Sequence, residues 1–80
     1  MTRFVATFHT HLAAILTSKA LQRAGITAKL SPVPRKLSSS CGSCVFYDSE
    51  DPAYSCLDSD TEAVYRVTGE EYVLCKVISE

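Results

Sequence analysis

Residues 3–31 change their hydrophobic period twice, and this pattern constrains the fold more than any other feature of the chain. Apolar and polar side chains alternate along residues 3–8, which predicts a strand with one buried face. Thr10 is a good N-cap, and the apolar residues that follow it recur with a helical period up to Ala24. Residues 26–31 alternate again and predict a second strand, closed by Pro32. The sequence therefore predicts a strand–helix–strand unit.

The predicted helix should pack on the sheet through a stripe of small and aliphatic side chains. That stripe contains Ala13, Leu16, Ala20 and Ala24. The opposite face, which includes Ser18 and Lys19, is expected to lie in solvent. Gly25 stands where a left-handed residue often ends a helix, so the helix should stop there.

The second half of the chain is predicted to extend an antiparallel sheet. Residues 44–47 are apolar, as in a short third strand, and residues 48–60 read as an acidic loop. A second helix is expected from Asp58 or Ser59 to Gly69, because acidic side chains favour the positive end of a helix. Residues 71–79 alternate again and predict the last strand.

These elements follow the order β-α-β-β-α-β, which is the ferredoxin-like pattern. The predicted fold class is α+β, with two helices on one face of an antiparallel sheet. The chain has 80 residues, so we expect residues 1–80 to form a single domain with a thin core.

Composition argues against several classes of protein. No apolar run approaches the roughly 20 residues of a membrane span, and the N-terminus lacks the pattern of a secretory signal. A cytoplasmic protein with reduced thiols is therefore expected. All the basic residues except Arg66 and Lys76 fall within residues 1–36. They are spread over strand, helix and loop, which favours a solvated surface over nucleic-acid binding.

The segment from Pro32 to Cys44 is the predicted site of chemistry. Two cations, Arg35 and Lys36, and three serines precede Cys41. Nearby cations, hydroxyls and loop amides stabilise a thiolate over a thiol, and Gly42 permits a tight turn. A reactive thiol at Cys41 is therefore predicted. A thiol redox module is one alternative, in which Cys44 would resolve a reversible disulfide, with Cys56 or Cys75 as further thiols.

A metal site is the alternative to a reactive thiol. Cys41 and Cys44 have the spacing of half a zinc or iron–sulfur site, and Cys56 and Cys75 could complete four thiolates. The last two have no close pair of their own, and they could equally be small apolar residues. Cys75 in particular falls within a predicted strand. No metal or cofactor is therefore favoured.

His9 and His11 flank the predicted N-cap of the first helix. The simpler interpretation is two exposed imidazoles, and the alternative is a proton donor or ligand that faces the Cys41 loop. In a ferredoxin-like topology we expect this turn and the Cys41 loop at opposite ends of the sheet, which argues against the alternative.

The Cys41 loop resembles the hallmark of the selenium/sulfur (Se/S) carrier protein-like family. The matching residues are Pro32, Val33, Pro34, Arg35, Leu37, Ser38, Ser39, Ser40, Cys41 and Gly42. The resemblance implies a non-enzymatic carrier that holds sulfur or selenium on Cys41 as a persulfide or perselenide. Arg35, Gly42 and the serines Ser38, Ser39 and Ser40 would form the shell that stabilises its anion.

The resemblance also implies partners for such a carrier. These are a donor of sulfur or selenium, such as a cysteine desulfurase, and an acceptor protein, and a homo-oligomer stays open. The sequence places no general base beside Cys41, so a carrier is expected rather than an enzyme. The chain departs from the family at Cys44, where a small or apolar residue is more usual. It also departs in residues 48–70, where members have a long charged helix.

Overall fold

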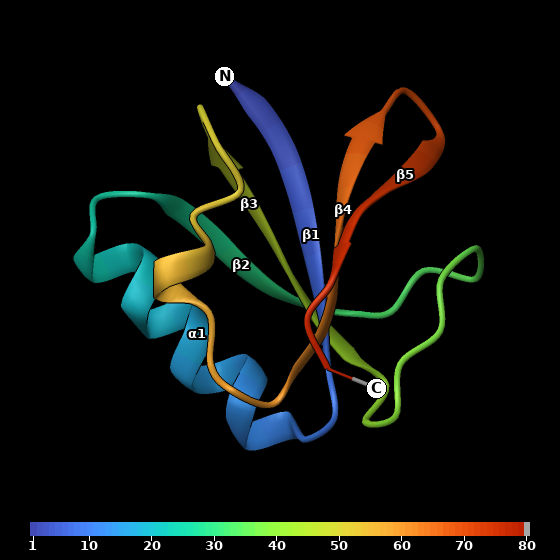
Figure 1. Cartoon of the computed structure of the whole chain (residues 1–80), viewed down its shortest axis with the longest axis horizontal. Helices are drawn as coiled ribbons and strands as arrows, with labels where there is room; N and C mark the ends of the chain where they lie inside the picture. The colour runs from blue at the N-terminus through green and yellow to red at the C-terminus, as the bar shows by residue number, and fades with distance from the viewer. Residues whose placement is uncertain (80) are drawn as a thin grey trace.

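The computed structural model describes residues 1–79 and contains one antiparallel sheet and one α-helix (Figure 1). The elements in chain order are β1 (Thr2–Phe8), α1 (His11–Arg23), β2 (Thr27–Pro32), β3 (Ser43–Ser49), the 3-10 helix η1 (Tyr54–Cys56), β4 (Thr61–Thr68) and β5 (Glu71–Val77). The strand order across the sheet is β2-β3-β1-β4-β5, so β1 lies at the centre. The α+β class and the antiparallel sheet are confirmed.

The predicted strand–helix–strand unit is confirmed and sets the topology of the sheet. Both β1 and β2 pair antiparallel with β3, which lies between them. The two strands therefore run parallel to each other, and α1 makes the crossover on one face. As a result, the carboxyl ends of β1 and β2 lie at the same end of the sheet.

Local signals account for the bounds of α1. The Thr10 hydroxyl accepts a hydrogen bond from the backbone N–H of Ala13 at 3.1 Å, as an N-cap does. Arg23 occupies the last turn, where a cation interacts favourably with the helix dipole. Gly25 follows with a φ of 80°, a conformation that terminates a helix at little cost.

The predicted apolar stripe of α1 is rotated relative to the observed one. The buried residues are Ala13, Ala14, Thr17, Ser18 and Leu21. By contrast, Leu12 and Leu16 are 63% and 47% exposed. Thr17 and Ser18 are polar, yet Thr17 is buried because its hydroxyl accepts a hydrogen bond from the Asp58 backbone. The acidic loop therefore contacts α1 at Thr17, and Ser18, which the period assigns to solvent, is buried.

The core lies between α1 and the sheet. Alternate residues of β1, namely Phe4, Ala6 and Phe8, contribute to it, as predicted. The rings of Phe4 and Tyr47 stack with centroids 5.5 Å apart. Val5 and Thr7 on the other face of β1 are also buried, so the central strand is covered on both faces.

The predicted second helix is wrong, because residues 61–68 form strand β4. β4 pairs with the free edge of β1 and returns through a two-residue turn into β5. Its sequence is rich in β-branched and aromatic residues, which favour a strand. The acidic residues before it stabilise a turn instead of a helix, since Asp58 accepts hydrogen bonds from the backbone of Asp60 and Thr61. The two-helix, ferredoxin-like pattern is therefore not formed by residues 1–79.

The other predicted boundaries need small changes. The third strand extends to residues 43–49, and the last strand ends at Val77.

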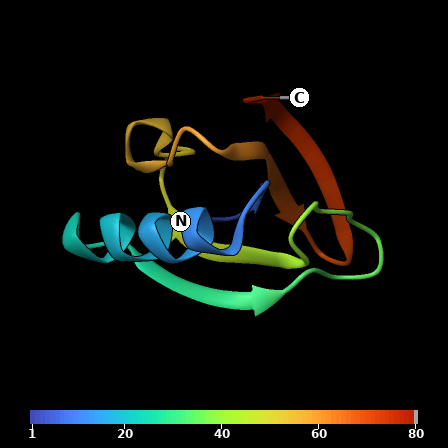
Figure 2. The same cartoon turned by 90° about the horizontal axis from the view of Figure 1, so that it is seen from below.

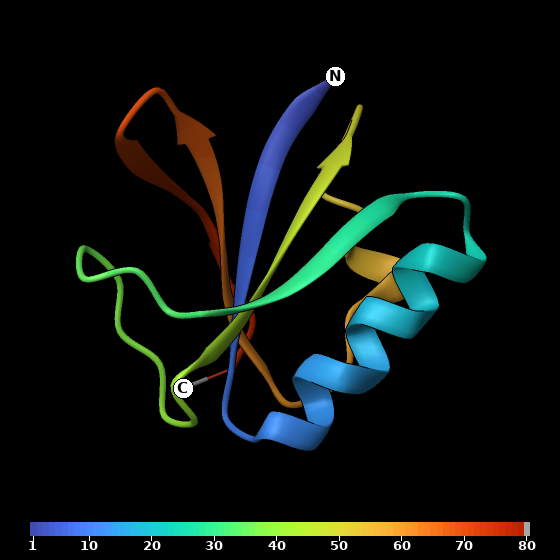
Figure 3. The ribbon, with the colours of Figure 1, turned by 180° about the vertical axis from the view of Figure 1, so that it is seen from behind.

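Residues 33–42 leave β2 on the side of the molecule away from α1 and reach the β4–β5 hairpin (Figures 2 and 3). No helix in residues 1–79 combines the length and the apolar character needed to cross a membrane.

Candidate functional site

A tight turn holds the thiol of Cys41 at the base of the 33–42 loop. The backbone N–H of Val33 donates to the carbonyl oxygen of Gly42 at 3.1 Å and closes the loop. Gly42 has a φ of 74°, which L side chains rarely adopt. This turn brings the backbone N–H of Ser43 to 3.4 Å from Cys41 Sγ, so the amide donates a hydrogen bond to the sulfur. An amide donor at this position stabilises negative charge on sulfur.

Ser39 is the second polar neighbour of the Cys41 thiol. Its Oγ lies 3.7 Å from Sγ, and it also donates to the carbonyl oxygen of Phe8 at 2.8 Å. The hydroxyl therefore connects the loop to the end of β1 while it contacts the sulfur. Cys41 itself is half-buried and packs against the hydrophobic core. The residue is thus held in place by these contacts while it remains partly exposed to solvent.

Ser40 attaches the loop to β4 through Glu62, a residue that the sequence analysis did not assign to the site. The backbone N–H and the hydroxyl of Ser40 donate to the two oxygens of Glu62 at 3.1 and 2.9 Å. His9 Nδ1 lies 3.4 Å from the same carboxylate, and His9 Nε2 lies 2.8 Å from the hydroxyl oxygen of Ser79. These contacts form a network of Ser40, Glu62, His9 and Ser79 beside Cys41.

Glu62→Gln is expected to loosen the Cys41 loop. Hydrogen bonds to a charged acceptor contribute more than neutral ones, so we expect a loss of about 1–2 kcal/mol in the free energy of unfolding. Amide hydrogen exchange at residues 39–42 should accelerate more than exchange in β1. Glu50→Gln is the matched control, since Glu50 is exposed and has no side-chain hydrogen bond within residues 1–79. Equal exchange rates in both variants would show that Glu62 does not hold the loop.

Both histidines face the Cys41 loop, which corrects the expectation that they lie at the other end of the sheet. His11 Nδ1 is 2.9 Å from the hydroxyl oxygen of Ser43, and His9 reaches the loop through Glu62. The physical reason is that β1 and β2 run parallel, so their carboxyl ends meet. Because α1 begins at His11, its positive end also lies next to the turn and favours an anion there.

A hollow of about 270 Å³ adjoins the turn, and it is lined by His11, Leu30, Ser31, Pro32, Gly42 and Ser43. Its walls combine aliphatic side chains with an imidazole and two hydroxyls. A small group that projects beyond the Cys41 turn would meet this mixed surface.

The predicted cations lie with the β4–β5 hairpin. Arg35 lines a hollow with Gly69, Glu70 and Tyr72. The ammonium of Lys36 donates to the Glu70 carbonyl oxygen at 2.9 Å and contacts Glu71. Neither cation makes a hydrogen bond or an ion pair with Cys41 in the part of the chain that the structure describes.

The three serines of the loop have different surroundings. Ser39 contacts the thiol and Ser40 binds Glu62, whereas Ser38 is exposed in a hollow lined by Leu37, Tyr65 and Tyr72. Of the predicted shell, the structure therefore brings Ser39 and the Gly42 turn to Cys41.

Cys44 has an environment opposite to that of Cys41. It is fully buried in β3, and its thiol contacts the carbonyl oxygen of Pro32 at 3.6 Å. Burial raises the pKa of the Cys44 thiol to about 11, although a hydrogen bond with Ser31 partly opposes this effect. Since the thiolate is the nucleophile in disulfide exchange, a neutral and buried thiol is poorly suited to resolve a bond at Cys41.

The stability of the protein should therefore fall at alkaline pH through Cys44. In the unfolded chain a thiol ionises near pH 8.5, whereas in the folded protein Cys44 ionises at about 11. The stabilisation that comes from burying the neutral Cys44 thiol is complete below the pKa of the unfolded chain. It is lost as the pH rises through the pKa of the folded protein, because the unfolded chain releases its proton first. Urea unfolding between about pH 8 and pH 11 should show a loss on the order of 2 kcal/mol that Cys44→Ala lacks. Parallel pH curves for both proteins would contradict this assignment.

The remaining cysteines do not converge on Cys41. Cys56 lies in η1 and packs against the core, while Cys75 is exposed on β5. All four cysteines are free thiols. Among residues 1–79, no group of three or more His, Cys, Asp or Glu side chains is arranged to hold a metal ion. The metal alternative therefore has no geometric support in this structure.

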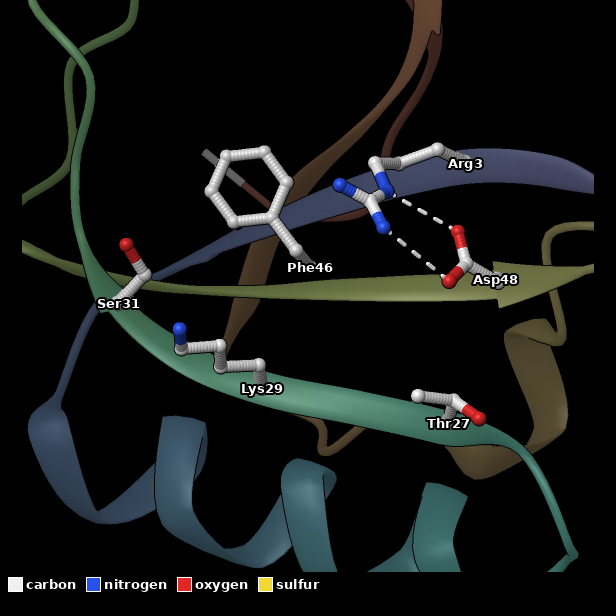
Figure 4. Close-up of a pocket in the computed structure, with 6 residues that line it drawn as sticks. All are labelled: Arg3, Thr27, Lys29, Ser31, Phe46 and Asp48. Carbon is white, nitrogen blue, oxygen red and sulfur yellow. Dashed lines mark hydrogen bonds and ion pairs between the residues drawn. The ribbon is translucent and has the colours of Figure 1, made fainter.

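A second hollow lies on the sheet face formed by β1, β2 and β3 (Figure 4). Arg3 forms a forked pair with Asp48 at 3.0 and 3.3 Å, and this pairing lowers the pKa of that carboxyl. Phe46 and Lys29 stand beside the pair. Asp48 neutralises Arg3, so Lys29 supplies the net positive charge of the hollow, and no thiol lines it.

Comparison with known proteins gives the family. The sequence model of the family described as "Putative Se/S carrier protein-like" matches residues 3–55, which include the whole Cys41 loop. The chain belongs to this family. It is also 44% identical over 46 residues to "Uncharacterized protein YtiA" of Escherichia coli (strain K12), across 58% of this chain and 54% of that protein. The chain thus spans about half the length of this relative. No solved structure matches the chain.

The family match also separates two parts of the site. Cys41, Ser39, His9 and His11 lie inside the matched residues, whereas Glu62 and Ser79 lie outside them. The thiol turn therefore belongs to the Se/S carrier-like region, and the network that holds the turn is completed by β4 and the residues after β5.

Proposed function

We propose that this protein is a carrier that holds sulfur or selenium on Cys41 as a persulfide or perselenide. The observation that carries the proposal is the hydrogen bond from the Ser43 amide to the sulfur of a half-buried cysteine, within the loop that the family shares. Membership of the Se/S carrier-like family supports the same role. The N-terminal end of α1 adds further stabilisation of an anionic sulfur.

The proposed loading step is a transfer between two thiols. The thiolate of Cys41 attacks the outer sulfur of a persulfide on a donor protein, such as a cysteine desulfurase. A new S–S bond forms at Cys41 while the S–S bond of the donor breaks, and the donor leaves as a thiolate. The proton of the transferred S–H group stays with its sulfur, so the step needs no external oxidant or reductant. Unloading to an acceptor thiolate is the same reaction in reverse.

The geometry favours carriage over thiol redox cycling. A redox pair needs a second thiolate that attacks the first sulfur, and the raised pKa of Cys44 keeps that thiol neutral near pH 7. Cys41, by contrast, receives a hydrogen bond from the Ser43 amide, which stabilises charge on its sulfur. We therefore propose that a loaded Cys41 persists until an acceptor protein removes the chalcogen.

Intact-mass spectrometry tests this proposal. The protein is incubated with a cysteine desulfurase and cysteine, and the excess reagent is removed. We expect a mass increase of one sulfur atom that dithiothreitol reverses. A protein that keeps its original mass under conditions in which an established sulfur acceptor is loaded would contradict the proposal.

A further inference from the structure

The hollow on the sheet face formed by β1, β2 and β3 is built on regular strand pairing (Figure 4). Strand β3 pairs without a register shift with β2 on one side and with β1 on the other. Phe46 of β3 lies directly opposite Lys29 of β2, and Asp48 of β3 lies directly opposite Arg3 of β1. Paired residues project on the same face of an antiparallel sheet, and α1 packs on the other face (Figure 2). These four side chains therefore form one surface whose geometry the sheet determines.

The ring of Phe46 is an unused stacking surface in this hollow. The side chain is half-buried and stands on the face of the sheet opposite α1. Within residues 1–79, the aromatic and cation–π contacts involve other rings. The face of the Phe46 ring is thus left for a planar partner, and stacking of two rings contributes to binding beyond the area that it buries.

The polar groups around Phe46 suit a ligand with one anionic group and several hydroxyls. Asp48 neutralises Arg3, whereas the ammonium of Lys29 has no hydrogen bond or ion pair within residues 1–79 and can bind a phosphate. Each oxygen of Asp48 accepts one hydrogen bond from Arg3, and a carboxylate can accept about four in total. The remaining lone pairs of Asp48 can accept hydrogen bonds from sugar hydroxyls, and Thr27 adds a hydroxyl to the same wall.

We propose that this hollow binds a nucleoside monophosphate, with the base on Phe46, the phosphate on Lys29 and the ribose hydroxyls on Asp48. The hollow has a volume of about 320 Å³, which is at the lower end of the range for small-molecule sites. Its single net positive charge suits one phosphate better than the row of phosphates on a nucleic-acid strand. One stacked base and one exposed ion pair give a dissociation constant on the order of 1 mM. The proposal is independent of the function of Cys41.

An NMR titration of the isotope-labelled protein with adenosine monophosphate tests the site. The amide signals of residues 27–31 and 44–48 should shift together and saturate, while those of β5 stay in place. Adenosine, which lacks the phosphate, should bind roughly threefold more weakly, and ribose phosphate, which lacks the base, at least about fivefold more weakly. Either fragment binding as tightly as the nucleotide would overturn the proposal. A titration without saturation up to about 20 mM nucleotide would overturn it as well.

Two substitutions separate the role of the ring from that of the charge. Phe46→Leu keeps an apolar side chain on the sheet, so the protein should stay folded while the nucleotide binds at least about fivefold more weakly. Lys29→Gln should weaken binding of the nucleotide roughly threefold and leave binding of adenosine unchanged. Lys19→Gln is the matched control, because Lys19 is also exposed but lies on α1.

Three outcomes of these measurements would contradict the assignment. The first is an unchanged affinity for adenosine monophosphate in Phe46→Leu, and the second is an equal affinity in Lys29→Gln and Lys19→Gln. The third is a single-stranded oligoadenylate that binds more than about tenfold tighter than the monophosphate, which would indicate a site for a nucleic-acid strand instead.

Discussion

Phe8→Ala is expected to lower the free energy of unfolding by about 3–5 kcal/mol, because it leaves a cavity at the centre of a small core. The Phe8 side chain is fully buried at the end of β1, where α1 packs on the sheet. Domains of ordinary size have a total stability of only about 5–15 kcal/mol. This one substitution should therefore bring the protein close to unfolding at room temperature.

Urea unfolding followed by circular dichroism measures this loss directly. Leu12→Ala is the matched control, because Leu12 lies on α1 but is 63% exposed. Its substitution should change the free energy of unfolding by about 0.5 kcal/mol or less. Similar losses in the free energy of unfolding at Phe8 and Leu12 would mean that the side of α1 that carries Leu12 is also packed against the protein.

Cys41→Ser is expected to abolish the uptake of sulfur from a persulfide donor. A serine hydroxyl does not ionise near neutral pH, so it cannot replace the thiolate as nucleophile. The remaining cysteines should not compensate, because Cys44 is buried and, within residues 1–79, Cys56 and Cys75 lack the amide and serine contacts of Cys41. We expect the bound sulfur to fall at least about tenfold, since the protein loses the nucleophile of the proposed carrier.

Cys75→Ser is the control for this experiment. Cys75 is the most exposed of the four cysteines, so non-specific reaction with the donor would occur there first. A carrier that uses Cys41 should load normally without Cys75. If Cys75→Ser reduced loading as much as Cys41→Ser, sulfur uptake would depend on how exposed each thiol is and not on the contacts that surround Cys41.

The sequence predicts the first half of the fold well because its signals are local. The change of period between residues 3–8 and 11–24, with Thr10 as a cap, requires no knowledge of tertiary contacts. Residues 61–68 are different, since their acidic start suggests a helix while their β-branched residues suggest a strand. The free edge of β1 decides between the two, and a single sequence does not reveal which strand lies at the centre.

The candidate site likewise has a part that local sequence predicts and a part that depends on tertiary contacts. Cys41, the Gly42 turn and Ser39 are close in sequence, so their association was predictable. The direction of the 33–42 loop depends on contacts with distant residues, such as those of Lys36 with Glu70 and Glu71. These contacts place the cations at the hairpin instead of at the thiol. Glu62 could not be assigned to the site from the sequence, because residues around it were predicted to form a helix. The signal that pointed to this end of the sheet was His9, which contacts Glu62.

Locating the sulfur atom within the loaded wild-type protein tests the central claim most directly. After incubation with a persulfide donor, the persulfides are blocked and labelled, and the peptides that contain each of the four cysteines are quantified. We predict that the added sulfur is on Cys41, with little on Cys75 and none on buried Cys44. A distribution that follows exposure, with most of the sulfur on Cys75, would contradict the assignment of Cys41 as the carrier thiol.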